Sequence, residues 1–373
     1  MTTAPGSRLS AAICAFKSSG HRLRPAPAYT SIRGDNGRLM SSEWSSIVST
    51  LAEDDSSNGA LKTPHKQSDG PLRYAYIAAY NKIVAAERRQ LDDGKDESGF
   101  GDRIGQLHQK HPELLELARN ERVTAFLRWA FDDDPIVFGS LNFERGTTQE
   151  AHIDAIFFWP EPSYSMAGCW VALEDIHPDS GPLFYVPASH TWPFYRSDDI
   201  VKARPALDQQ RTAARSLDFP ADKRSKVVAE LGHTWTEDFR ALERSYRSER
   251  PALNLRAGDV VFWHSLLAHG GSPRINPKLS RRSAVFHFVG KRTLLYTFEQ
   301  FMLYDREEVQ SQPPQKFDLQ SYKGLKYIRY PYFTTYNGAR ETVHQLDAGA
   351  DISKAASPAP SAWRKTVARL LGR

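Results

Sequence analysis

The chain has 373 residues, of which 40% are hydrophobic, 11% aromatic and 25% charged, with a mean hydropathy of −0.53. These values exclude a fibrous or wholly disordered chain, and no apolar run approaches the roughly 18–20 residues that a membrane span requires. The only two cysteines, Cys14 and Cys169, are too few for a disulfide framework or a thiolate zinc cluster. Any metal chemistry must therefore use nitrogen and oxygen ligands.

The net charge of +5 is concentrated at the two ends of the chain. Residues 1–40 hold six basic residues against one acidic residue, and the last twenty hold five basic residues and no acidic one, which leaves the body between them at −5. Binding to nucleic acid requires clustered cations that neutralise phosphates. The distribution of charge therefore argues against a nucleic-acid partner.

Residues 1–70 are expected to be a disordered leader and linker. The first 34 residues contain no acid, many Ser and Thr and scattered Arg, which is the composition of an organellar transit peptide; the alternative that we favour is a leader preceding a true start at Met40. Ala11–Phe16 is too short for the apolar region of a secretory signal. The cytoplasm is therefore the expected location.

Residues 71–134 are predicted to form a helical support. Apolar residues recur at spacings of three and four from Leu72 to about Asp93, which predicts a helix there. Further helices are predicted at Arg103–Asn120 and Arg122–Phe131.

After the acidic segment DDDP the pattern changes to short β-branched and aromatic runs separated by Gly, Pro, Asn and Asp: IVFGSLNF, AHIDAIFFW, MAGCWVALEDI, PLFYVPA, GDVVFWHSL and RRSAVFHFV. Such runs predict a sandwich or barrel of short strands. We expect a core at 135–295, with a helical insertion at about 197–250 over one mouth of the barrel. An extension at 296–350 is expected to pack on the core, and 351–373 reads as a linker and basic tail.

His152-Ile153-Asp154, inside the predicted strand AHIDAIFFW, is the strongest local motif. Residues i and i+2 of a strand project from one face about 6–7 Å apart. An iron(II) ion that binds both a cosubstrate and dioxygen uses two His and one carboxylate on one face of its octahedron. His269, at the end of GDVVFWHSLLAHGG, is the natural third ligand, whereas His264 is expected to face the opposite side. By itself the H-x-D pair is also compatible with a structural His-Asp hydrogen bond.

Arg281 follows His269 by 12 residues and opens the strand RRSAVFHFV. A guanidinium there could bind a carboxylate through two hydrogen bonds, as the far end of a 2-oxoacid cosubstrate requires. Arg281 and Arg282 alternate faces, so only one can enter the site. The alternative for an Arg at a strand mouth is a surface ion pair.

These motifs resemble the phytanoyl-CoA dioxygenase family of iron(II)- and 2-oxoglutarate-dependent oxygenases. The resemblance covers roughly Pro135–Gly290 and rests on SLNFERG, HIDAIFFW, GCWVALEDIHPDSGPLFYVPASH and GDVVFWHSLLAHGGSPRINPKLSRRSAVFHF. It implies three metal ligands that form the catalytic set: His152, Asp154 and His269. It implies three residues that bind the cosubstrate: Arg281, Asn142 and Trp170. One extra residue between His269 and the Arg pair leaves Arg282 as a rival anchor.

The fold expected is mainly β with flanking helices (α+β), with a double-stranded β-helix, or jelly-roll, cupin-like core. The resemblance implies iron(II), 2-oxoglutarate as cosubstrate and dioxygen, with hydroxylation of an aliphatic C–H in a small metabolite or lipid-like substrate and release of succinate and carbon dioxide. Two alternatives stay open: a catalytically silent jelly-roll binding protein, and a zinc hydrolase on the same ligands. No motif selects a substrate or an oligomeric state.

Two further histidines are given structural roles. His190, in VPASH, is expected in a turn. His287, in the middle of AVFHFVG, is expected to line the core or a pocket without binding a metal.

Overall fold

The computed structural model describes residues 13–16, 70–91, 103–193, 196–329, 332–334 and 340–342. Most of the expected leader and the whole of the expected basic tail lie outside these residues. Within the described part of the chain, no helix has both the length and the apolar character that crossing a membrane would require.

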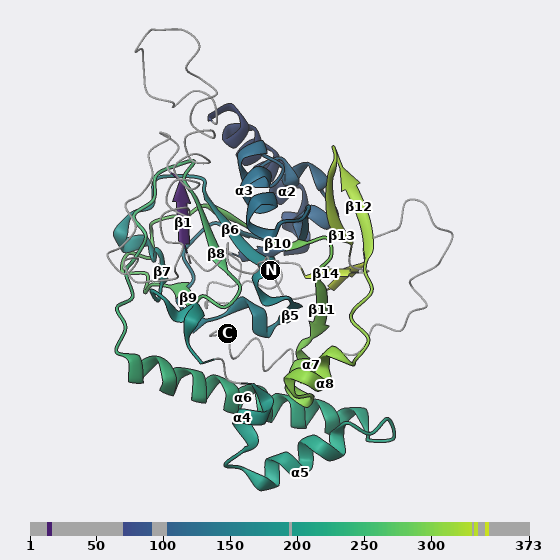
Figure 1. The fold of residues 1–373 in the computed structure, drawn as a ribbon. Helices are drawn as coiled ribbons and strands as arrows, with labels where there is room; N and C mark the ends of the chain where they lie inside the picture. The colour runs from purple at the N-terminus through teal and green to yellow at the C-terminus, as the bar shows by residue number, and fades with distance from the viewer. Residues whose placement is uncertain are drawn as a thin grey trace, which may run out of the picture.

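A large twisted sheet forms one side of the core (Figure 1). Its strands, in spatial order, are β1 (Ile13–Phe16), β8 (Val260–His264), β6 (Met166–Ala172), β10 (Ser283–Gly290), β3 (Pro135–Phe143), β13 (Leu325–Arg329) and β12 (Asp318–Tyr322), with β2 (Arg103–Gly105) beside β3. All the neighbours pair antiparallel except β13 and β3, which are parallel.

Within the described residues, shorter strands form three further sheets, of which the three-stranded one forms the other side of the core. One small sheet has the order β4 (Gln149–His152), β9 (His269–Gly271) and β7 (Leu183–Tyr185); β5 (Phe158–Glu161) pairs with β11 (Leu294–Thr297), and β14 (Tyr332–Thr334) with β15 (Arg340–Thr342). Trp170, Trp263 and Val285 of the large sheet share one buried cluster with Leu183 of the small sheet. The two sheets therefore face each other, and the predicted jelly-roll core with flanking helices is confirmed.

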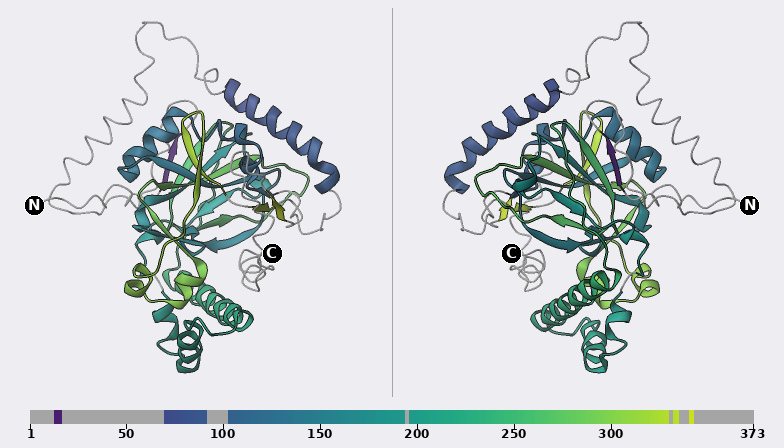
Figure 2. Two further views of the ribbon diagram at one scale, coloured as in Figure 1. Left: turned by 90° about the vertical axis from the view of Figure 1, so that its right-hand side faces the viewer. Right: turned by 90° about the vertical axis from the view of Figure 1, so that its left-hand side faces the viewer.

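Helices α2 (Gly70–Leu91) and α3 (Glu121–Phe131) cover the outer face of the large sheet (Figure 2). Tyr76 and Phe126 from these helices belong to the same buried cluster as Cys169 and Phe286 of the sheet. Alternate residues of each strand and one side of each helix point into this interface, and the other strand residues point toward the small sheet, so β6 is buried at every position.

The helix predicted at Arg103–Asn120 is wrong. The segment contains β2 and two short 3₁₀ helices, η5 (Leu107–Gln109) and η6 (Pro112–Leu115). Gln106 has a left-handed backbone (φ 61°), and Pro112 carries no N–H, so a continuous helix cannot pass through either position. Pairing of β2 with the sheet supplies the hydrogen bonds that a helix would have supplied.

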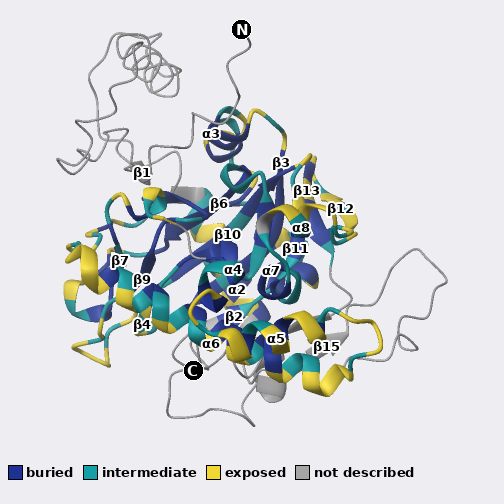
Figure 3. Cartoon of the chain, turned by 60° about the horizontal axis from the view of Figure 1, so that its bottom comes forward, coloured by how far each residue is buried: buried dark blue, intermediate teal, exposed yellow. Residues whose placement is uncertain are grey.

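The polar segment after residue 196 forms α4 (Ser197–Val201), α5 (Pro205–Ala214) and α6 (Ala221–Tyr246), followed later by α7 (Phe298–Leu303) and α8 (Arg306–Gln310). Helices α5 and α6 expose one side to solvent (Figure 3). The other side buries Leu231 and Trp235 in one cluster with Ile156, Trp159 and Phe301. The insertion therefore packs directly against the segment that follows β4.

Ion pairs link these helices to one another and to the segment at α8. The three shortest of these links among the described residues are Arg204–Asp238 at 2.8 Å, Arg211–Asp305 at 2.6 Å and Arg215–Glu308 at 2.9 Å; Arg215 also lies 3.8 Å from Asp305. Arg211 is buried and also donates to the Ser197 hydroxyl at 2.8 Å. Four short 3₁₀ helices complete the described elements: η7 (Asp154–Ile156), η8 (Ser163–Ser165), η9 (Pro178–Ser180) and η10 (Ser189–Thr191).

Candidate metal centre

The predicted strand AHIDAIFFW is interrupted in the structure: β4 ends at His152, η7 begins at Asp154 and β5 begins at Phe158. The prediction of one continuous strand was therefore wrong. The turn is closed by the Phe157 N–H, which donates to the Asp154 carbonyl at 3.1 Å, and the Ala155 N–H donates to the Ser265 carbonyl at 3.1 Å. Ile153 keeps an extended backbone (φ −118°, ψ 141°), so His152 and Asp154 still project to the same side.

His269 reaches this pair through the register of the small sheet. β4 and β9 are antiparallel neighbours, and His152 lies directly opposite His269. The strands approach closely because Gly271 has no side chain: a Cβ there would lie 2.0 Å from the Thr147 carbonyl oxygen. The two imidazole centroids are 4.5 Å apart.

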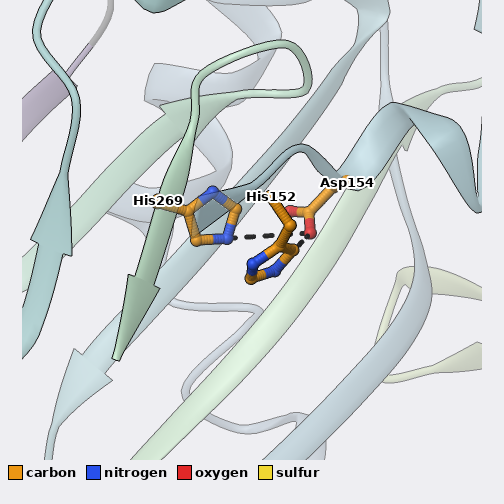
Figure 4. A group of neighbouring side chains, drawn as sticks. All are labelled: His152, Asp154 and His269. Atoms are coloured by element: carbon orange, nitrogen blue, oxygen red, sulfur yellow. Dashed lines mark ion pairs between the residues drawn. The ribbon is translucent and has the colours of Figure 1, made fainter. Parts of the chain in front are cut away.

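His152, Asp154 and His269 each offer a ligand atom, and these atoms all lie within 4.8 Å of one another (Figure 4). Nε2 of His152 is 3.9 Å, and Nε2 of His269 3.7 Å, from Oδ1 of Asp154. The arrangement could hold one metal ion.

The orientation of both imidazoles is set by the backbone. Nδ1 of His152 lies 3.0 Å from the Glu150 carbonyl, and Nδ1 of His269 lies 3.0 Å from the Leu267 carbonyl. Because a carbonyl can only accept, Nδ1 carries the proton in the neutral form of each ring, and Nε2 is then the lone-pair nitrogen on the side of Asp154. A backbone carbonyl on the non-ligating nitrogen is the usual support of a metal-binding histidine. The donor set suits a divalent metal such as iron(II).

Asp154 is buried, which by itself raises the pKa of its carboxyl. The neighbouring imidazoles of His269, His287 and His152 act in the opposite direction and hold that pKa well below its usual range. The carboxylate is therefore ionised at neutral pH and is the negatively charged member of the group.

The two arginines at the start of β10 occupy different environments. Arg281 is 2% exposed, donates to the Gly181 carbonyl at 2.7 Å and lies over the Phe143 ring at 5.2 Å; its Nε has no hydrogen-bond partner among the described residues. Burial lowers the pKa of Arg281 to about 10, so it stays charged at neutral pH. Arg282 turns outward and pairs with Glu144 at 3.1 Å. Of the two, only Arg281 points into the core.

The two other residues expected to bind the cosubstrate, Trp170 and Asn142, lie on opposite faces of the large sheet. Trp170 is fully buried on the inner face of β6, in the cluster that also holds Trp263. Asn142 lies on the opposite face of β3, where its amide oxygen accepts from the Tyr76 hydroxyl of α2. The structure therefore does not bring Asn142 to the inner face of the large sheet, which faces His152 and His269. Alternation along the strand turns its side chain toward the helices instead.

Two residues beside Asp154 were not assigned to the site from sequence. Trp263 Nε1 donates to Asp154 Oδ2 at 2.7 Å, and His287 Nε2 lies 3.4 Å from the same oxygen. An aromatic residue in a strand is explained equally well by core packing, so the sequence carries no signal for Trp263. His264 stays outside the group: its Nδ1 accepts from the Leu266 N–H at 3.0 Å, and its ring lies near His190.

Comparison with known proteins identifies relatives of this chain. The sequence model of the phytanoyl-CoA dioxygenase (PhyH) family matches residues 75–283. The proteins named phytanoyl-CoA dioxygenase domain-containing protein 1 of Mus musculus and Bos taurus are 30% and 32% identical over 89 residues. Each match covers 23% of this chain and 31% of the relative, so it spans about a third of the length of these relatives.

Two solved structures are similar to this chain at low sequence identity. The non-heme α-ketoglutarate-dependent carbocyclase SnoK from nogalamycin biosynthesis is 19% identical with a TM-score of 0.42, covering 65% of this chain and 83% of its own. EctD from S. alaskensis, solved with bound Fe, is 15% identical with a TM-score of 0.39, covering 63% of this chain and 75% of its own.

Proposed function

The chain belongs to the phytanoyl-CoA dioxygenase family, and from this premise we propose that it is an iron(II)- and 2-oxoglutarate-dependent dioxygenase that hydroxylates an aliphatic C–H of a small metabolite or lipid-like substrate. The observation that carries the proposal is the meeting of His152, Asp154 and His269, whose ligand atoms lie within 4.8 Å of one another.

The chain's own residues would hold and orient the reacting groups. Nε2 of His152, Nε2 of His269 and Oδ1 of Asp154 would bind the metal on one side, which leaves its other positions for cosubstrate and dioxygen. When bound, iron(II) would supply, with 2-oxoglutarate and dioxygen, the oxidation of an aliphatic C–H, in which one oxygen atom enters the substrate and the other enters succinate as carbon dioxide is released. The protein contributes position, charge and exclusion of competing reactions.

Arg281 would bind the distal carboxylate of 2-oxoglutarate. It is buried and charged, and its Nε is without a partner among the described residues. A guanidinium in that state gains a charge-assisted hydrogen bond when a carboxylate enters. Trp170, on the same inner face, would line the cosubstrate pocket, whereas the contact of Asn142 with Tyr76 supports a structural role.

The test is release of succinate from 2-oxoglutarate under air with iron(II), measured with a panel of candidate substrates. Mass spectrometry of the same mixtures would reveal the substrate by a gain of one oxygen atom. Turnover that depends on both iron(II) and 2-oxoglutarate, and that disappears in Asp154→Ala, is the expected result.

Other outcomes would favour the other two functions. If the protein binds neither metal nor 2-oxoglutarate and shows no turnover, it is a silent jelly-roll binding protein. Hydrolysis that depends on zinc and requires no 2-oxoglutarate would indicate a hydrolase on the same ligands. The proposal of a dioxygenase would be withdrawn in either case.

A further inference from the structure

We propose that Trp263 and His287 are positioning residues: they contact one carboxylate oxygen of Asp154, so that only the other oxygen is available to bind the metal. Gly168 makes this possible because it provides the space for the Trp263 indole. The inference rests on the proposed metal site and concerns how that site is held in shape.

The two oxygens of Asp154 have different neighbours. Oδ1 faces the two histidines, at 3.9 Å from His152 Nε2 and 3.7 Å from His269 Nε2. Oδ2 accepts from Trp263 Nε1 at 2.7 Å and lies 3.4 Å from His287 Nε2. Oδ1 is therefore turned toward the two histidines, and Oδ2 contacts side chains of the large sheet.

Trp263, Gly168 and His287 occupy one row across three neighbouring strands. Gly168 of β6 lies opposite Trp263 of β8 on one side and opposite His287 of β10 on the other. A Cβ on Gly168 would lie 2.1 Å from Cε2 and 2.5 Å from Nε1 of the indole. Only glycine at this position allows the indole to lie across β6 and reach Asp154.

Trp263 also contacts a second ligand of the group. The centroids of its ring and of the His269 imidazole are 4.6 Å apart, and the indole is 3% exposed. A buried carboxylate needs hydrogen-bond donors for its lone pairs, and an indole N–H can only donate. With Oδ2 occupied by this donor, Asp154 would bind through Oδ1 alone, which leaves more of the metal's positions for cosubstrate and dioxygen.

The decisive experiment measures the affinity of the protein for Mn(II), without oxygen and without turnover. The concentration of free Mn(II) is read from its electron paramagnetic resonance signal during a titration. Trp263→Phe removes the N–H and keeps an aromatic ring, while Gly168→Ala displaces the indole without changing its chemistry. We expect each variant to bind Mn(II) about 10- to 100-fold more weakly, the range found when supports of metal ligands are removed. Visible absorption of the Co(II) forms should change in both variants as the carboxylate becomes free to bind through two oxygens.

Trp159→Phe is the matched control, since Trp159 is also buried and donates its indole N–H to a carboxylate, that of Glu161 at 2.6 Å. Its Mn(II) affinity and Co(II) spectrum should match those of the wild type. His287→Gln keeps a hydrogen-bond donor and should bind Mn(II) more tightly than His287→Ala.

The outcomes separate the two proposals. If the wild type binds no Mn(II), or if Asp154→Ala binds it equally well, the proposed metal site fails. If the wild type binds Mn(II) through Asp154 but folded Trp263→Phe and Gly168→Ala bind it within threefold of wild type, the positioning role is refuted and the metal site stands. Should Trp263→Phe or Gly168→Ala fail to fold, the positioning role is tested by the other variant and by the comparison of His287→Gln with His287→Ala.

Discussion

Replacing Arg281 by Ala tests whether this side chain binds the cosubstrate. Arg281 is 2% exposed, and its guanidinium makes one described hydrogen bond, to the Gly181 carbonyl, together with its contact with the Phe143 ring. The fold has therefore already removed the cation from water. Because burial lowers its pKa only to about 10, it remains charged through the neutral range.

The size of the effect follows from the bonds that a carboxylate would form. Each hydrogen bond to a charged group contributes about 1.5–3 kcal/mol, so two of them amount to about 3–6 kcal/mol. At about 1.4 kcal/mol for each factor of ten, the lower bound corresponds to about a 100-fold loss of affinity for 2-oxoglutarate. Arg281→Lys should fall between wild type and Arg281→Ala, because an ammonium keeps the charge and loses the planar pair of donors.

The assay is a titration of 2-oxoglutarate, read as succinate release and, independently, as heat of binding under nitrogen. Arg282→Ala is the control, because that side chain is directed outward and its pair with Glu144 is partly exposed; such pairs contribute about 0–1 kcal/mol, and its requirement for 2-oxoglutarate should stay within threefold of wild type. A larger effect at Arg282 than at Arg281 would assign the anchor to Arg282. No effect at either would show that the carboxylate binds elsewhere.

Three further predictions concern the site and the fold. Asp154→Ala should abolish turnover and metal binding while the far-ultraviolet circular dichroism stays unchanged; full activity would refute its assignment as a ligand. Leu231→Ala, at a fully buried position of α6, should lower the free energy of unfolding by about 2–5 kcal/mol in urea titrations, and a loss below 1 kcal/mol would show that the insertion does not pack tightly. Burial lowers the pKa of His108 to about 3, and its neighbours Ser140 and Gln109 bond the neutral ring. The unfolded chain, with a histidine pKa of about 6.5, binds a proton that the folded chain excludes, so stability should be full above pH 6.5 and fall below it by about 1.4 kcal/mol per pH unit. Urea unfolding at pH 7.5 and 5.5 should show this loss reduced in His108→Gln; an equal loss in both proteins would contradict the assignment.

The candidate ligands could be predicted from sequence because each motif is local. Three residues, His-Ile-Asp, keep two side chains on one side as long as the middle residue is extended, and Ile153 is extended although the strand breaks immediately afterwards. The same alternation separates Arg281 from Arg282, one of which is buried and the other partly exposed. Short apolar runs between Gly and Pro likewise sufficed to predict a sandwich or barrel of short strands, and the resemblance to the family specified the jelly-roll core.

Failures of prediction came where backbone geometry or long-range packing decides. The segment at 103–120 contains residues that favour a helix. Pairing of β2 with β3 and the left-handed backbone at Gln106 override this helix propensity. Asn142 belongs to a motif that resembles the family. Which face of β3 points into the core depends, however, on the helices packed against its outer face, where the Tyr76 hydroxyl donates to the Asn142 amide oxygen.

The sequence by itself determined the family, the class of fold and the chemical character of the candidate ligands, since all of these are written in residue types and short spacings. Tertiary structure alone decided that His152 lies opposite His269, and that Trp263 and His287 meet on one oxygen of Asp154 across the gap left by Gly168. The physical reason is that this register and these close approaches between strands depend on contacts between residues that are 95 or more positions apart in the chain. No local pattern encodes those contacts.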